Sequence, residues 1–281
     1  MASKKRGVVL CADDFGMSEG VSAGILDLAD RNRISATSAM VNGPDWRRSA
    51  PMLRERSGAI GVGLHFNLTL GVPLGPMPQW APDGRLPSLG RAIGRALAGT
   101  AALDEVEVEF ERQLAAFEDA YGSGPDFVDG HQHVHVLPGI RDRVLAVLAR
   151  RGDRALWLRD PSQPLGALRG EGFPGKAMAV RALGFGFAKK AHKAGFATNE
   201  GFSGFSAFDR DPDVGAMFER ALRRLGPKPL VMCHPGRPEA APGALDEVVE
   251  SRPRELAYLK SSAFAELLER HGLKLVPRPG G

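Results

Sequence analysis

The chain has 281 residues, of which 43% are hydrophobic and 25% are charged, a composition typical of a globular protein with a large core. Its formal net charge is only +4 and its basic residues are scattered, so the sequence predicts no nucleic-acid partner. No apolar run approaches the roughly 20 residues of a membrane span, and too few apolar residues follow the basic N-terminus for a signal peptide, so we expect a cytoplasmic protein.

The two cysteines, Cys11 and Cys233, both lie in apolar, strand-like segments. Such positions favour reduced core residues, as expected in the cytoplasm. The sequence therefore indicates no zinc cluster built from thiolates.

The first predicted strand is the apolar run 8–12, which leads directly into Asp13 and Asp14. Its β-branched members favour a strand that is covered on both faces. Because the carboxyl ends of parallel strands line the ligand crevice, the two acids are placed for metal binding or proton transfer. The alternative is an ordinary Asp-Asp turn into a helix, with Gly16 at a positive φ and Ser18 as the N-cap.

Strands and helices alternate along the chain, which favours a parallel sheet. A Pro- and Gly-rich segment at 71–87 interrupts the pattern, and we expect it to form a long loop over the mouth of the site. The predicted helices are 19–32, 45–56, 104–121, 140–148, 176–194, 214–225 and 253–271, and the further predicted strands are 35–41, 59–64, 127–128, 155–158, 197–202, 229–233 and 273–276. About seven βα units without a linker predict a single α/β domain over residues 1–281, a complete or incomplete barrel.

Histidines cluster at the predicted carboxyl ends of strands, although one such histidine alone is usually a hydrogen-bonded structural residue. Histidine stands at the ends of three predicted strands, and a pair of aspartates stands at the end of another. This combination favours a ligand set for a divalent metal such as zinc. On an extended segment three of the histidines would point to one face, although a turn after Gly130 would break that pattern. Five of the seven histidines belong to this group: His65, His131, His133, His135 and His234.

Four ordered motifs resemble those of the YdjC-like carbohydrate deacetylases, a family that includes chitooligosaccharide deacetylases and hopanoid-biosynthesis deacetylases. They cover most of the chain and lie at 12–16 (ADDFG), 63–69 (GLHFNLT), 131–135 (HQHVH) and 233–236 (CHPG). One departure is Gln132, which stands where the family often has a third consecutive histidine.

The resemblance implies a distorted or incomplete (β/α) barrel of the glycoside hydrolase/deacetylase type. It also implies one divalent metal ion, Mg or Zn, held by Asp14, His65 and His131. In such a site the metal would activate a water that removes the acetyl group from an N-acetylated amino sugar.

By the same resemblance Asp13 would be the general base, and His234 would match the position of the general acid. His133, His135 and Arg159 are further candidates, either to orient the metal ligands or to contact the substrate.

Two other classes of function use similar residues. A metal-dependent phosphoesterase would need a comparable Asp and His set, though two-metal phosphoesterases usually have more bridging carboxylates than this sequence offers. A non-catalytic sugar-binding or metal-binding protein could share the same scaffold. The presence of Asp13 beside Asp14, together with His234, favours catalysis over binding alone.

The segment 172–199 is basic and aromatic, with five basic residues and no acidic one. Its ordinary interpretation is an outer helix of the barrel with a solvated basic side. The sharper hypothesis is a peripheral membrane contact through anionic headgroups, with a glycolipid as substrate, as the hopanoid branch would imply. The partner is thus an acetylated sugar or a glycolipid, and a homodimer is a further expectation. The residues concerned are Lys176, Arg181, Lys189, Lys190 and Lys193, interleaved with Phe185, Phe187 and Phe196.

Overall fold

The fold is built around a curled parallel sheet. The computed structural model describes residues 5–152, 154–163, 174–206, 213–239 and 250–281. Its strands pair in the order β6-β5-β4-β3-β2-β1-β8-β7, and β9 pairs in parallel with the start of β1. The strands are β1 (Arg6–Phe15), β2 (Ala36–Ala39), β3 (Gly61–Phe66), β4 (Phe127–Gly130), β5 (Trp157–Leu158), β6 (Ala197–Thr198), β7 (Phe202–Ser203), β8 (Leu230–Cys233) and β9 (Leu273–Leu275).

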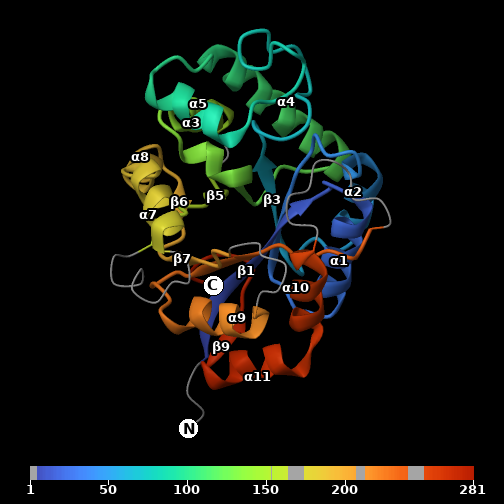
Figure 1. The fold of residues 1–281 in the computed structure, drawn as a ribbon. Helices are drawn as coiled ribbons and strands as arrows, with labels where there is room; N and C mark the ends of the chain where they lie inside the picture. The colour runs from blue at the N-terminus through green and yellow to red at the C-terminus, as the bar shows by residue number, and fades with distance from the viewer. Residues whose placement is uncertain (1–4, 153, 164–173, 207–212, 240–249) are drawn as a thin grey trace.

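Helices lie around the outside of the strands, as Figure 1 shows. The longest, α4, buries Val106, Phe110 and Phe117 on one face. It is capped by Gly122, whose φ of 88° is left-handed and therefore ends the helix. The described helices are α1 (Glu19–Asp30), α2 (Trp46–Arg54), α3 (Leu89–Leu97), α4 (Leu103–Tyr121), the 3₁₀ helix η1 (His131–Val136), α5 (Ile140–Arg151), α7 (Pro174–Leu183), α8 (Phe187–Lys193), α9 (Val214–Arg223), α10 (Ser251–Lys260) and α11 (Ser262–Arg270).

The first strand is covered on both faces, as its apolar run predicted. Val8, Leu10 and Ala12 pack into the larger core cluster, whereas Val9 and Cys11 pack into a second cluster on the other side. Alternation of side chains along the strand explains this division. Cys233 is also buried, and both cysteines are free thiols.

The sheet curls but stays open, so the barrel is incomplete. The predicted strand 197–202 is wrong as one element, because β6 and β7 stand at opposite ends of the strand order. Between them Gly201 adopts a φ of 110°, and a Cβ there would lie 2.7 Å from the Gly226 backbone. In the part of the chain that the structure describes, no pairing joins β6 to β7.

The predicted helix 253–271 is two helices. It breaks at Ser261, whose extended backbone ends α10 and whose hydroxyl caps α11 by accepting the Phe264 N–H at 3.4 Å. The predicted helix 176–194 is likewise divided into α7 and α8, with Gly186 at a φ of 79° before α8.

The loop 71–87 is tied to α4. Glu109 accepts the N–H of Leu74, and Glu105 accepts the N–H of Trp80. The cavity described below is lined by residues on either side of this loop, Thr69 and Ser88 among them. The loop therefore anchors the cavity wall to the helix layer.

None of the helices in the described ranges is long and apolar enough to cross a membrane.

Candidate active site

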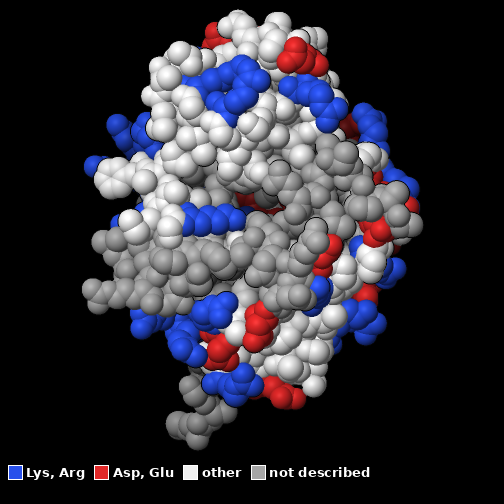
Figure 2. Space-filling view, in the orientation of Figure 1, with Lys and Arg blue, Asp and Glu red and all other residues white. Residues whose placement is uncertain are grey.

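The carboxyl ends of four parallel strands meet in one cavity of about 650 Å³. Asp13 and Asp14 lie near the end of β1, His65 lies in β3, His131 follows β4 and His234 follows β8. All five residues line the cavity. The space-filling view in Figure 2 shows a hollow near the middle of the face turned toward the viewer, with acidic atoms at its floor.

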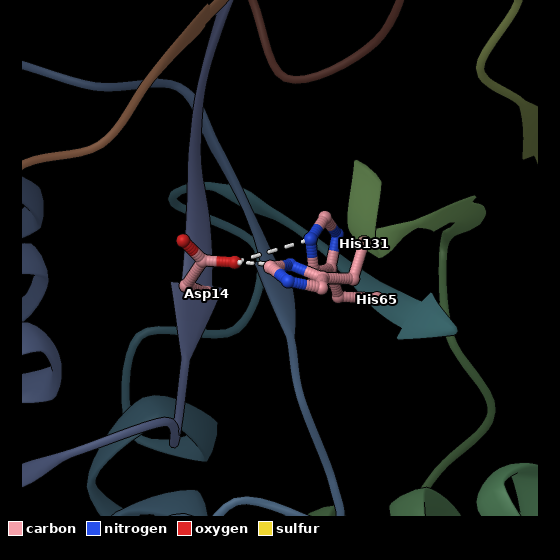
Figure 3. A group of neighbouring side chains, drawn as sticks. All are labelled: Asp14, His65 and His131. Carbon is pink, nitrogen blue, oxygen red and sulfur yellow. Dashed lines mark hydrogen bonds and ion pairs between the residues drawn. The ribbon is translucent and has the colours of Figure 1, made fainter. Parts of the chain in front are cut away.

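Asp14, His65 and His131 converge on one point. Oδ1 of Asp14 lies 3.2 Å from Nε2 of His65 and 3.2 Å from Nδ1 of His131. The three potential ligand atoms lie within 4.8 Å of one another. In Figure 3 both imidazole rings point toward the Asp14 carboxylate.

The second nitrogen of His65 is held by a carboxylate that the sequence analysis did not select. Nδ1 of His65 lies 2.7 Å from Oδ1 of Asp129 and 3.0 Å from the Ser38 hydroxyl. A carboxylate partner on Nδ1 leaves Nε2 to face Asp14, which is the arrangement typical of metal-binding histidines.

The electrostatic field at this point favours a cation. Burial alone would lower the pKa of His65, but the Asp129, Asp14 and Asp13 carboxylates outweigh it and raise that pKa to about 10. One carboxylate oxygen and two imidazole nitrogens form a donor set that zinc and related divalent metals accept. These residues therefore fit the metal that the family resemblance implies.

Asp13 has a different set of partners from its neighbour. Arg159 forms a fork on it, with Nη1 2.6 Å from Oδ2 and Nη2 2.7 Å from Oδ1, and the Ser38 hydroxyl donates to Oδ1 at 3.3 Å. Burial would raise the pKa of Asp13, but Arg159 outweighs it and holds that pKa well below the usual range. Asp13 is therefore an oriented, ionised carboxylate.

The three histidines after β4 separate, because the chain turns instead of staying extended. Gln132 and His133 have φ values of 52° and 62°, in the left-handed region. His131 reaches Asp14, whereas the His133 ring packs edge-on against Phe202 at 5.4 Å between ring centroids. The chain therefore takes the second of the two conformations considered from the sequence, the turn after Gly130, and the three side chains do not share one face.

Two of the tentative substrate residues lie behind the cavity rather than in its lining. Arg159 is fully buried, and its Nη2 also pairs with Oδ2 of Asp129 at 2.5 Å. His135 is buried as well, with Nε2 2.7 Å from the Arg159 carbonyl oxygen. Of the three tentative residues, His133 lines the cavity.

His234 is positioned by a buried acid. Its backbone N–H donates to Oε2 of Glu255, on α10, at 2.7 Å. Burial lowers the pKa of His234 to about 4 and raises the pKa of Glu255 to about 7. In the free protein His234 is therefore neutral at pH 7.

Sequence reasoning missed four polar residues of this site: Ser38, Asp129, Arg252 and Glu255. Asp129 had a local signal, since it directly precedes the histidine motif at a strand end. Arg252 and Glu255 had none, because they reach the site from α10, which lies far along the chain from the strand-end motifs.

A comparison with known protein families decides the relationship. The profile of the YdjC-like proteins matches residues 7–270, which is most of the chain. The chain belongs to the YdjC-like family. The family resemblance drawn from the four motifs is therefore confirmed.

Curated proteins that are similar in sequence to this YdjC-like chain are named chitooligosaccharide deacetylases. The protein from Enterobacter sp. (strain 638) is 41% identical over 146 residues, which are 52% of this chain and 56% of the relative. The protein from Serratia marcescens is 38% identical over 146 residues, with the same shares of each chain. The match thus spans about half the length of these relatives.

A solved structure supports the fold of the YdjC-like chain. A protein from Enterococcus faecalis V583, whose assigned activity of cellobiose-phosphate cleavage is provisional, superimposes with a TM-score of 0.72 at 21% identity. The superposition covers 97% of each chain. At that identity the likeness concerns the fold alone.

Proposed function

We propose that this protein is a metal-dependent hydrolase that removes the acetyl group from an N-acetylated amino sugar. The observation that carries the proposal is the convergence of Asp14, His65 and His131 at the floor of a cavity that Asp13 and His234 also line. Family membership and the names of the curated relatives support the same chemistry.

Asp14, His65 and His131 would hold the metal. Two imidazole nitrogens favour a zinc-type ion over magnesium, which prefers oxygen ligands. When bound there, such an ion would acidify a water molecule and polarise the acetamide carbonyl.

Asp13 would accept the proton of the attacking water. Arg159 and Ser38 hold both of its oxygens, so little reorientation is needed during the reaction. The same arginine makes Asp13 a weak base, so its part in proton transfer would depend on a water that a bound metal has already acidified.

His234 would deliver a proton to the departing amine, which is a poor leaving group unless it is protonated. Because burial keeps this ring neutral at pH 7, its extra proton has to arrive during turnover. Glu255, which holds the His234 backbone, would fix the position of the ring relative to the cavity.

Acetate release from an N-acetylated glucosamine disaccharide tests the proposal. We expect turnover with Zn²⁺ or Co²⁺ and none after chelation. Phosphate release from a sugar phosphate, or metal binding without any hydrolysis, would contradict it and favour a phosphoesterase or a binding protein.

A second candidate substrate is an amphiphile, because much of the described cavity lining is aliphatic. Leu70, Leu89, Ile93, Val180 and Leu183 line it and are only partly buried. A ligand that covers such side chains gains about 25 cal/mol for each Å² of apolar surface removed from water. Sugar-stacking aromatic residues do not appear in the described lining: Trp80, Trp157, Phe202 and Phe205 are all buried.

The basic segment adds less to this second candidate than the sequence indicated. Phe187 and Phe196 are buried, whereas Phe185 is 78% exposed and Met178 is 58% exposed. Lys190 pairs with Asp142 at 2.5 Å, so part of the charge is compensated. Residues 172 and 173 lie outside the described residues.

Two assays run side by side, vesicle co-sedimentation and acetate release, distinguish the two candidate substrate classes. Salt-sensitive binding to anionic vesicles with poor turnover of the disaccharide would favour a glycolipid. Brisk turnover of the disaccharide without vesicle binding would favour a soluble oligosaccharide.

A further inference from the structure

A buried arginine from the last part of the chain holds one oxygen of the Asp14 carboxylate. Nη2 of Arg252 lies 2.8 Å from Oδ2 of Asp14, and both side chains are almost fully buried. The other oxygen, Oδ1, is the one that faces His65 and His131. The two oxygens of Asp14 thus have separate partners.

Arg252 also supports the loop that carries His234. Its carbonyl oxygen accepts the N–H of Gly236 at 3.3 Å. A Cβ at Gly236 would lie 3.1 Å from Cδ of Arg252, so the loop packs closely on the arginine stem. One residue of α10 therefore contacts both the metal-ligand candidate and the loop of the acid candidate.

We propose that Arg252 is a positioning residue, which makes Asp14 a ligand through Oδ1 alone. The inference rests on the metal centre of the proposed function. A carboxylate can bind a metal through one oxygen or through both, and a charged hydrogen bond to Oδ2 favours the first mode. Asp14 also has a left-handed backbone, with a φ of 72°, so its orientation needs support from its partners.

Two opposing effects act on metal affinity. The positive charge of Arg252 repels a cation, which would weaken metal binding. The same guanidinium holds the buried Asp14 carboxylate in one orientation through its 2.8 Å contact with Oδ2, which leaves Oδ1 directed at the two histidines. Because outer-shell partners that orient a ligand strengthen metal binding, we expect the second effect to dominate.

The test compares Arg252→Met with wild type in metal titrations followed by calorimetry, with Co²⁺ as the probe. We expect Arg252→Met to bind Co²⁺ about 10- to 100-fold more weakly, the range measured for outer-shell partners of metal ligands. The visible absorption bands of bound Co²⁺ should also shift, because Asp14 is then free to bind through both oxygens. Lys260→Met is the matched control: Lys260 lies on the same helix and pairs with Asp27 at 2.7 Å, and its loss should leave both readouts unchanged.

Wild-type affinity and an unchanged Co²⁺ spectrum in folded Arg252→Met would overturn the inference, and so would tighter binding. If that variant does not fold, Arg252→Gln decides, because glutamine is neutral and too short to reach Oδ2: weaker binding supports the inference and wild-type binding overturns it. Acetate release is not needed for this test. A protein that binds Co²⁺ in an Arg252-dependent way but releases no acetate would support the role of Arg252 and refute the proposed function.

Discussion

Two adjacent carboxylates near the end of β1 take different partners. Asp13 faces the Arg159 fork, and Asp14 faces two histidines and Arg252. Adjacent side chains of a strand leave it in different directions, and Asp14 in addition has a left-handed backbone, with a φ of 72°. We therefore expect substitution of the two acids to have different effects on metal binding and on turnover.

Asparagine at each position separates the two roles. Asp13→Asn should keep its metal but lose turnover by roughly 10²-fold or more, the scale of general-base catalysis. Asp14→Asn should lose metal first, because an amide oxygen is a weaker ligand than a carboxylate. Metal analysis and acetate release from both purified variants check this expectation, and equal metal occupancy in the two would contradict it.

The buried acid Glu255 should make stability depend on pH. Its pKa is about 7 in the folded protein and 4.5 in a model peptide, so the folded state binds this proton more tightly than the unfolded chain does. The free energy of unfolding that Glu255 contributes therefore falls as the pH rises from 4.5 to 7. Glu255→Gln should become more stable relative to wild type by about 3 kcal/mol over that range, at 1.36 kcal/mol for each pKa unit.

Urea unfolding of both proteins without metal, between pH 4.5 and 7.5, measures this difference. The lowered pKa of His234 acts in the opposite direction, since its contribution to stability rises with pH between about 4 and 6.5. That contribution is present in both proteins and cancels when they are compared. A constant difference across the range would show that Glu255 is ionised throughout.

At the scale of elements, the turns that follow β1 and β2 fix the two acids. The backbone N–H of Asp45 donates to the Gly16 carbonyl oxygen at 3.1 Å, and that of Met40 donates to Phe15 at 2.7 Å. Gly43 fits between them: a Cβ there would lie 2.2 Å from the Gly16 carbonyl oxygen. The close approach of two backbones explains why this position needs glycine.

Gly43→Ala should therefore destabilise the protein, by about 1–3 kcal/mol, as overpacking does elsewhere. The clash is with backbone, so no change of side-chain rotamer can relieve it. Gly94→Ala is the control, because Gly94 lies within α3 with no atom within 4 Å of an added Cβ. That variant should gain roughly 0.5–1 kcal/mol of helix stability. Urea unfolding of the two variants measures both effects. Equal free energies of unfolding for Gly43→Ala and Gly94→Ala would contradict the prediction and show that the backbone of the two turns can move to accommodate the added methyl group.

At the scale of the whole molecule, curling of the sheet brings distant segments of the chain together. Direct pairing of β1 with both β2 and β8, and of β3 with β4, places the ends of these strands around one cavity. The candidate ligands thus come from the first half of the chain, whereas His234 and Arg252 come from its last quarter. Binding of a metal at this point should stabilise the folded state as a unit.

Metal should accordingly raise the stability of wild type and leave ligand variants unaffected. At a free metal concentration of 100 times the dissociation constant, the expected gain is about 2.7 kcal/mol. His65→Ala and His131→Ala should lose both this gain and tight metal binding, whereas His192→Ala, an exposed position on α8, should keep them. Thermal unfolding with and without Zn²⁺ provides the measurement. Wild-type metal content in the folded His65→Ala and His131→Ala proteins would refute the ligand assignment.

Local sequence patterns were sufficient for much of the fold and for the first members of the site. Apolar periodicity predicted α1 and α4 closely, because each buries one face along its whole length. The apolar run before Asp13 and the short segment before His65 predicted β1 and β3, because buried parallel strands are nearly continuous in hydrophobicity.

Tertiary structure alone decided the rest, because the deciding contacts join residues that are far apart in the sequence. The turn at Gln132 sends His131 and His133 in different directions, and no local periodicity encodes that turn. Whether Arg159 would touch substrate or a carboxylate depended on how β5 packs beside β4. Arg252 could not be selected from the sequence, because its helix shows an ordinary mixture of charged and apolar residues and its partner lies near the other end of the chain.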